Sequence, residues 1–157
     1  MSILDDLRQG GLIEKVEPDQ ATATGWLDDA SRHVEGATKI AELDPSGAYV
    51  LAYDAARKSM AAALLMSGHR VLSRPGSHQA LAQYAESIAT QVDEPALNRF
   101  DRLRRNRNRS EYGSRTFGKA EVAEAIDTAR AIRAACASSS ESATESSRRE
   151  PERIRCG

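Results

Sequence analysis

The chain has 157 residues, enough for one domain with a sizeable core. Its 22 Lys and Arg residues nearly balance its 23 Asp and Glu residues, and the formal net charge is −1, so any nucleic-acid binding must come from a local basic patch. No apolar stretch approaches the ~20 residues that cross a bilayer, and residues 1–6 lack a signal-peptide pattern. With Cys136 and Cys156 as its two cysteines, the chain is expected to be cytoplasmic, with free thiols.

Alanine is abundant and aromatic residues make up only 4 % of the chain, which favours an all-α protein. Residues 1–18 carry a short apolar pattern broken by Gly10-Gly11, and we expect a helical arm that packs on a neighbour. Apolar residues then recur at spacings of three and four, which predicts five longer helices. These cover residues 20–43, 46–68, 77–91, 95–112 and 119–137. No segment shows the alternation of a β-strand.

The break between the first two long helices is the sequence Asp44-Pro45-Ser46-Gly47, and Ser46 is the expected cap of the helix that follows. That helix, residues 46–68, is apolar on most of its circumference, so it belongs at the centre of a bundle or at a dimer interface. Pro95 suits the first turn of a later helix, where its missing N–H costs nothing.

Helices joined by short connections predict a four- to five-helix bundle over residues 19–137. The remainder, residues 138–157, is rich in Ser, Glu and Arg. It holds too few apolar side chains to offset the entropy of ordering, and we expect it to be disordered.

Six arginines crowd into positions 99–109, at 99, 102, 104, 105, 107 and 109. On a helix, Arg105, Asn108 and Tyr112 share one polar face, with Arg102 and Arg109 along its edge. Closely spaced arginines repel one another and Asn is a mediocre helix former, so folding alone does not explain this composition. One interpretation is a phosphate-binding face, because guanidinium groups bind phosphate through paired hydrogen bonds. The other is a solvated helix end paired with acids on neighbouring helices or on a second subunit.

The three histidines, His33, His69 and His78, show no metal-ligand spacing, and no metal or cofactor is expected. The linker residues Arg70 and Arg74, with His78, either extend a surface for an anionic ligand or are solvated.

Asp54 and Arg57 lie three residues apart on the central helix, so they either pair with each other or face the arginine helix of a partner subunit. Tyr49, Tyr53 and Tyr84 are expected to be core or interface residues whose hydroxyl groups reach a polar partner.

Two segments, residues 53–60 and 104–113, together with the linker 71–78, resemble the HEPN superfamily, and the similarity covers residues 21–137. The resemblance implies a bundle of four or five helices and a homodimer in which the arginine motifs line a shared cleft. Many members are metal-independent endoribonucleases, including toxins of toxin–antitoxin pairs and host-defence effectors. Some act with a minimal nucleotidyltransferase.

The family motif is an arginine, often followed by a polar residue, with a histidine four to six residues later. Read from Arg107, the histidine position holds Tyr112; read from Arg105, it holds Ser110. The resemblance implies a catalytic role for Arg107, Asn108 and Tyr112, RNA phosphate contacts for Arg102, Arg105 and Arg109, and a supporting role for Asp54 and Arg57.

Two hypotheses about function follow. In the first, a dimeric HEPN protein binds RNA and cleaves it in a toxin–antitoxin or defence setting, with an antitoxin or a nucleotidyltransferase as partner. Tyr112 then replaces histidine, which requires nearby arginines to lower a phenol pKa that is ordinarily near ~10. In the second, an inactive HEPN module uses the same face to bind RNA, a nucleotide or an acidic partner protein.

Overall fold

The computed structural model describes residues 2–88, 94–112 and 116–148. Within these ranges the chain forms helices and two short strands, which confirms the predicted all-α class apart from the strands. In chain order the elements are α1 (Ile3–Gln9), β1 (Ile13–Lys15), α2 (Gln20–Ile40), α3 (Pro45–Met66), β2 (His69–Val71), α4 (Ser77–Ile88), α5 (Glu94–Tyr112) and α6 (Lys119–Arg148).

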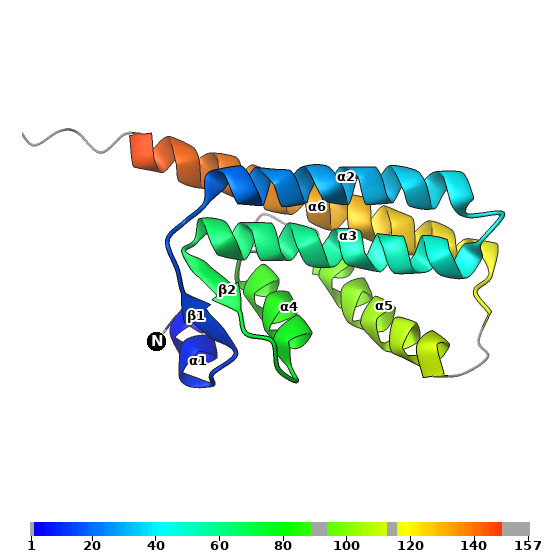
Figure 1. Cartoon of the computed structure of the whole chain (residues 1–157), viewed down its shortest axis with the longest axis horizontal. Coiled ribbons are helices and arrows are strands. Elements are labelled where there is room, and N and C mark those ends of the chain that lie inside the picture. The colour runs from blue at the N-terminus through cyan, green and yellow to red at the C-terminus, as the bar shows by residue number, and fades with distance from the viewer. Residues whose placement is uncertain (1, 89–93, 113–115, 149–157) are drawn as a thin grey trace, which may run out of the picture.

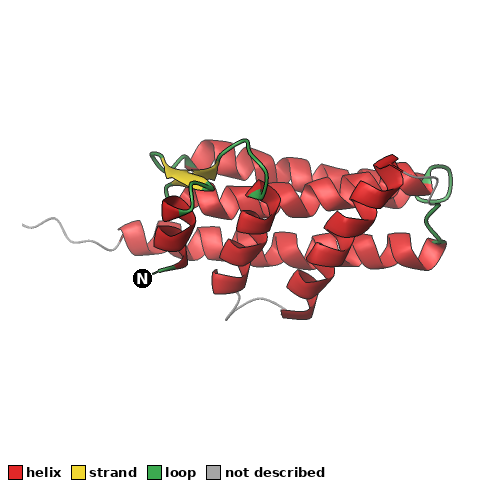
Figure 2. Ribbon diagram, turned by 90° about the horizontal axis from the view of Figure 1, so that it is seen from below, coloured by secondary structure: helices red, strands yellow, loops and turns green. Residues whose placement is uncertain are grey.

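The three longest helices, α2, α3 and α6, pack against one another along their lengths (Figure 1). The shorter α4 and α5 pack against α3 on one side of this group and contact each other, and α5 also contacts α6. Seen from that side, α1, α4 and α5 lie in front of the long helices (Figure 2). The site described below is built where α3, α4 and α5 meet.

Helix α3 lies at the centre of the molecule. This confirms the first of the two positions expected for a helix that is apolar on most of its circumference. It packs against α2, α4, α5 and α6. Many of its buried residues are alanines, and such small side chains let neighbouring helices approach closely. The buried set is Ala48, Tyr49, Ala52, Tyr53, Ala55, Ala56, Ser59, Met60, Ala62, Ala63, Leu64 and Leu65.

Asp44, not Ser46, caps α3. The Asp44 carboxylate accepts a hydrogen bond of 2.9 Å from the backbone N–H of Gly47. Pro45 takes the first helical turn, because its fixed φ suits a helix and its missing N–H is not needed there. The residue before it is therefore the cap, and the expectation for Ser46 is wrong.

The expectation that the chain has no strand is also wrong. The arm at residues 1–18 is helical only in α1, and β1 then pairs with β2 in an antiparallel two-stranded sheet, with Ile13 opposite Val71. Strands of three residues are too short to show alternation, and their partners lie far apart in the sequence. Gly68, with φ +82°, lets the chain turn from α3 into β2.

The last helix continues beyond its expected end at Ala137 to Arg148, so residues 138–148, expected to be disordered, are helical. Once a helix is established, each added residue gains a hydrogen bond, and α6 extends past the part that packs on the bundle. Three parts of the predictions lie outside the described residues: residues 89–91 of the expected third long helix, residue 113 at the end of the segment 104–113, and the tail from 149 to 157. None of the described helices is long and apolar enough to span a membrane.

The cap assignment is testable by substitution. We expect Asp44→Ala to lower the free energy of unfolding by about 1 kcal/mol, because the amides of the first turn of α3 lose their acceptor. Ser46→Ala, at an exposed position one residue past the proline, is the matched control and is expected to change it by less than about 0.5 kcal/mol. Urea unfolding measures both, and a larger effect at Ser46 would contradict the assignment.

Candidate functional site

The arginines of α5 divide among its faces. Phe100 and Leu103 anchor the helix in the core. Positions three and four residues further on share their side, and here Arg107 lies over the ring of Tyr53 in α3, with its guanidinium carbon 5.0 Å from the ring centroid. Arg104 lies on the adjoining side, toward α4.

Two of the arginines are directed to α6. Arg99 donates a hydrogen bond of 3.0 Å from Nε to the hydroxyl of Thr128, which is buried. Arg102 donates to Glu124 at 3.2 Å, although 63 % of its side chain is exposed. Arg102 is one of the arginines predicted to contact phosphate. In the structure it pairs with an acid on a neighbouring helix, as the second interpretation of the arginine cluster expects.

Arg105 and Arg109 lie on the exposed side of α5. Arg105 donates to one oxygen of Asp101 at 2.6 Å, and Arg104 donates to the other at 2.9 Å. The hydrogen bond from Arg104, with a smaller contribution from Arg105, lowers the pKa of Asp101. Two guanidinium groups thus share one carboxylate, and the cluster keeps a net positive charge.

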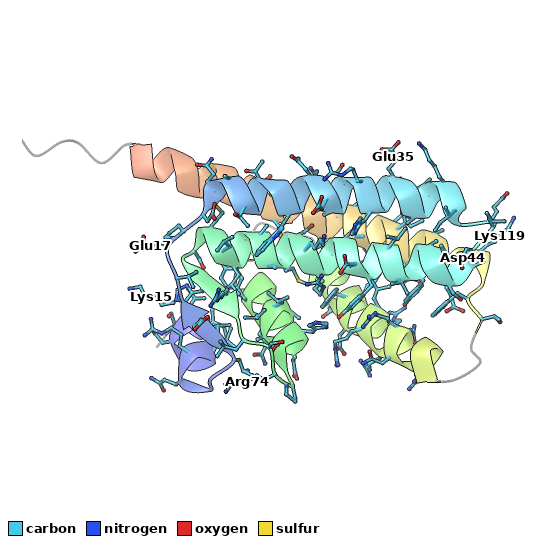
Figure 3. The ribbon with its side chains drawn as sticks, viewed as in Figure 1. Lys15, Glu17, Glu35, Asp44, Arg74 and Lys119 are labelled. Atoms are coloured by element: carbon cyan, nitrogen blue, oxygen red, sulfur yellow. The ribbon has the colours of Figure 1, made fainter. Side chains whose placement is uncertain are left out.

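A hollow of about 390 Å³ lies between α5 and the start of α4. Arg104 and Asn108 line it from α5, and Arg74, which is labelled in Figure 3, lines it from the loop before α4. No acidic residue is among the described residues that line it. The full lining is Ser73, Arg74, Pro75, Gly76, Ser77, His78, Gln79, Arg104 and Asn108.

The loop that borders the hollow is fixed by its own hydrogen bonds. Gly76 has φ +92°, where any side chain is strained. The buried hydroxyl of Ser77 donates to the carbonyl oxygen of Arg74 at 2.6 Å and accepts from the Arg74 amide at 3.3 Å. This geometry brings the first turn of α4 to the hollow, where helix amides carry partial positive charge.

A histidine lies in this hollow. His78, in the first turn of α4, is half-buried, and its Nδ1 is hydrogen-bonded to the hydroxyl of Tyr53. Tyr53 is 2 % exposed and stacks on Phe100, with ring centroids 5.6 Å apart and planes within 8°. The sequence motif did not identify His78 as part of the site, because it lies on a different helix from the arginines. The resemblance of the linker 71–78 and the alternative that grouped Arg74 with His78 were the available signals.

Burial is the main cause that keeps this pair neutral at pH 7. Burial, reinforced by Arg57, Arg107 and Arg104, lowers the pKa of His78. Burial raises the pKa of Tyr53, although the same three arginines act in the opposite direction. The arginines therefore do not outweigh the effect of burial on the pKa of the Tyr53 phenol. The neutral imidazole is the group that can exchange a proton near pH 7.

Asp54 and Arg57 pair with each other, the first of the two arrangements considered. Arg57 donates to Asp54 through Nε at 3.0 Å and Nη2 at 2.5 Å. His33 Nδ1 lies 3.2 Å from the other Asp54 oxygen, without hydrogen-bond geometry. The charge of Arg57 acts on both Tyr53 and His78, but neither Asp54 nor Arg57 lines the hollow.

The side chains of Ser110 and Tyr112 lie outside the described residues, although the backbone of α5 continues to Tyr112. Among the described residues, no group of three or more His, Cys, Asp or Glu side chains is placed to hold a metal ion. No family model, curated protein or solved structure matches the chain.

The lowered pKa of His78 makes a prediction about stability. The unfolded chain binds a proton at this ring near pH 6.5, and the folded chain binds it only at lower pH, so stability present above about pH 6.5 is lost as the pH falls. His78→Gln removes this contribution. We expect its free energy of unfolding to fall less than that of the wild type between pH 7 and pH 5, as measured by urea unfolding. The carboxylates titrate in both proteins, so parallel curves would contradict the burial of His78 among cations.

Proposed function

We propose that the chain is an HEPN-like protein that binds RNA at the hollow between α4 and α5 and cleaves it without a metal ion. One observation carries the proposal. Arg104, Asn108 and His78 line the same hollow, so a histidine lies beside the arginine helix although the helix itself has none. A cation, an amide and a proton-transfer group in one place suit a phosphodiester.

The charge distribution supports a phosphate ligand. Arg104 lines the hollow from α5 and Arg74 lines it from the loop before α4, and the first turn of α4 adds its amides. Arg105 and Arg109 continue the positive surface along the exposed side of α5, where they can contact neighbouring phosphates of the same strand. Binding through such contacts weakens with salt, because counterions are released when phosphates are neutralised.

Cleavage at this site would proceed by transesterification within the RNA. The 2′-oxygen attacks the adjacent phosphorus, the P–O2′ bond forms and the P–O5′ bond breaks, leaving a 2′,3′-cyclic phosphate and a free 5′-hydroxyl. A bound phosphate raises the pKa of His78, whose imidazolium then gives its proton to O5′, while the proton of the 2′-hydroxyl leaves to solvent. Arg104 stabilises the charge that develops on the phosphate, and Asn108 orients the phosphate. Arg107 adds positive charge from its position over the Tyr53 ring, outside the lining of the hollow.

Tyr112 remains in the proposal as the residue at the histidine position of the family motif. Its contribution is separable from that of His78, because the two lie on different helices. If His78 is the general acid, Tyr112→Phe leaves cleavage largely intact. If Tyr112 is the general acid, the same substitution removes cleavage.

The resemblance to HEPN proteins adds an assembly and a setting. In the proposed homodimer the basic sides of two α5 helices face each other, so that Arg102, Arg105 and Arg109 of both subunits line one RNA-binding cleft. The setting is cytoplasmic, with an antitoxin or a minimal nucleotidyltransferase as partner. Analytical ultracentrifugation tests the dimer, and a monomer at tens of micromolar would contradict it.

The direct test of function is incubation of the purified protein with labelled tRNA and total RNA in EDTA. We expect the wild type to yield 2′,3′-cyclic phosphate ends and His78→Ala to lose about 10²–10⁴-fold in cleavage rate. The wild type is expected to retain RNA more tightly at low salt than at high salt. Arg104→Gln is expected to weaken RNA binding. Arg130→Gln is the matched control, because it removes the same charge from an exposed position on α6 beside α2.

Each other outcome has a defined meaning. If the protein retains RNA in a way that depends on Arg104 but does not cleave it, the hollow is an RNA-binding site and the proposed nuclease activity is wrong. Cleavage that survives His78→Ala and disappears in Tyr112→Phe would move the acid–base role to α5. Equal effects of Arg104→Gln and Arg130→Gln would mean that net charge, not the hollow, attracts RNA.

A further inference from the structure

We infer that Tyr53 is a positioning residue that holds His78 in one orientation and one tautomer, with Nε2 as the nitrogen offered to a ligand in the hollow. The catalytic consequence rests on the proposed function. The orientation and the tautomer do not, since they follow from the hydrogen bond between the Tyr53 hydroxyl and His78 Nδ1.

Tyr53 is rigid enough for this role. Its side chain is 2 % exposed in the centre of α3. One neighbour is the stacked ring of Phe100, 5.6 Å away between centroids, and another is the Arg107 guanidinium, 5.0 Å from the centroid. A ring packed in this way holds its hydroxyl in one position, and in that position the hydroxyl is hydrogen-bonded to Nδ1 of His78.

The hydrogen bond also decides where the imidazole carries its proton. Within the described part of the chain, His78 Nδ1 is the only atom hydrogen-bonded to the Tyr53 hydroxyl. A buried hydroxyl needs an acceptor for its proton, so Tyr53 donates and Nδ1 of the neutral ring accepts. The ring proton is then on Nε2. When His78 becomes an imidazolium, the same hydroxyl can accept from Nδ1–H, because a phenol oxygen serves in both directions.

His78 depends on this contact for its orientation. It lies in the first turn of α4, where its side chain is only half-buried. Its side chain makes no other hydrogen bond to the described residues. The charges that act on the His78 ring come from Arg57 and Asp54 on α3 and from Arg104 and Arg107 on α5. These charges fix neither the rotation of the ring nor its tautomer. Without the hydroxyl, the ring can flip and present either nitrogen.

The test is ¹⁵N NMR of the histidine rings, with the His78 signals assigned from a His78→Gln spectrum. At pH 8 we expect the wild type to show unprotonated Nδ1 and protonated Nε2. Tyr53→Phe keeps the stacked ring and removes only the hydroxyl, and we expect a mixture of both tautomers. Tyr84→Phe is the matched control, because Tyr84 is a buried tyrosine whose hydroxyl donates to the carbonyl of Ala63, whereas His78 is hydrogen-bonded to Tyr53. A His78 tautomer that is unchanged in Tyr53→Phe would overturn the inference, as would a wild type with protonated Nδ1.

Kinetics provides a second readout. With RNA as substrate, Tyr53→Phe is expected to lower kcat about 10- to 100-fold and leave KM within about twofold, because the acid is misplaced while the phosphate contacts remain. Tyr84→Phe is expected to match the wild type in both. If the wild type cleaves no RNA but the tautomer changes in Tyr53→Phe, the proposed nuclease fails and the positioning role stands. If Tyr53→Phe leaves kcat unchanged, the positioning role fails even in an active enzyme.

Discussion

The contact between the Tyr53 hydroxyl and His78 Nδ1 is the interaction on which the candidate site depends. It joins the central helix α3 to the first turn of α4, and the ring of Tyr53 carries Arg107 of α5 on its face. Three helices that are separate in the sequence therefore meet at one buried phenol. Charge alone would not achieve this, because arginines repel one another and a half-buried histidine among them loses its proton.

The position of Tyr53 is in turn a consequence of how α3 is packed. Alanines on α3 let the long helices approach closely, and Phe100 of α5 stacks on the tyrosine ring in the space that remains. The same anchoring of α5 places Arg104 and Asn108 toward α4 and leaves Arg105 and Arg109 exposed. One helix thus supplies groups to the hollow and a positive surface outside it, which suits a ligand with several phosphates.

The sequence predicts the helices well, because apolar spacing reports the buried face directly, and it predicts the central position of α3. It misses the strands, since pairs of three residues leave no alternation, and it misplaces the cap at Ser46 because Pro45 competes for the first turn. For the site, spacing along one helix predicts Asn108, which lines the hollow. It also predicts Arg102, Arg105 and Arg109, which do not line the hollow, and it does not single out Arg104, which does. It cannot identify His78, whose approach to α5 depends on the path of the chain through β2 and the Gly76 turn.

We propose that His78 and Arg104 act on the same phosphate. The most direct measurement is the pKa of His78 by NMR during titration with an RNA oligonucleotide whose 2′-oxygens are methylated, which can bind but cannot be cleaved. We expect the pKa of His78 to rise as the oligonucleotide binds, because a phosphate is brought to Nε2, and we expect Arg104→Gln to abolish this rise. If the oligonucleotide binds while the pKa of His78 stays unchanged, the RNA binds elsewhere on the protein, and the proposed role of the hollow is wrong.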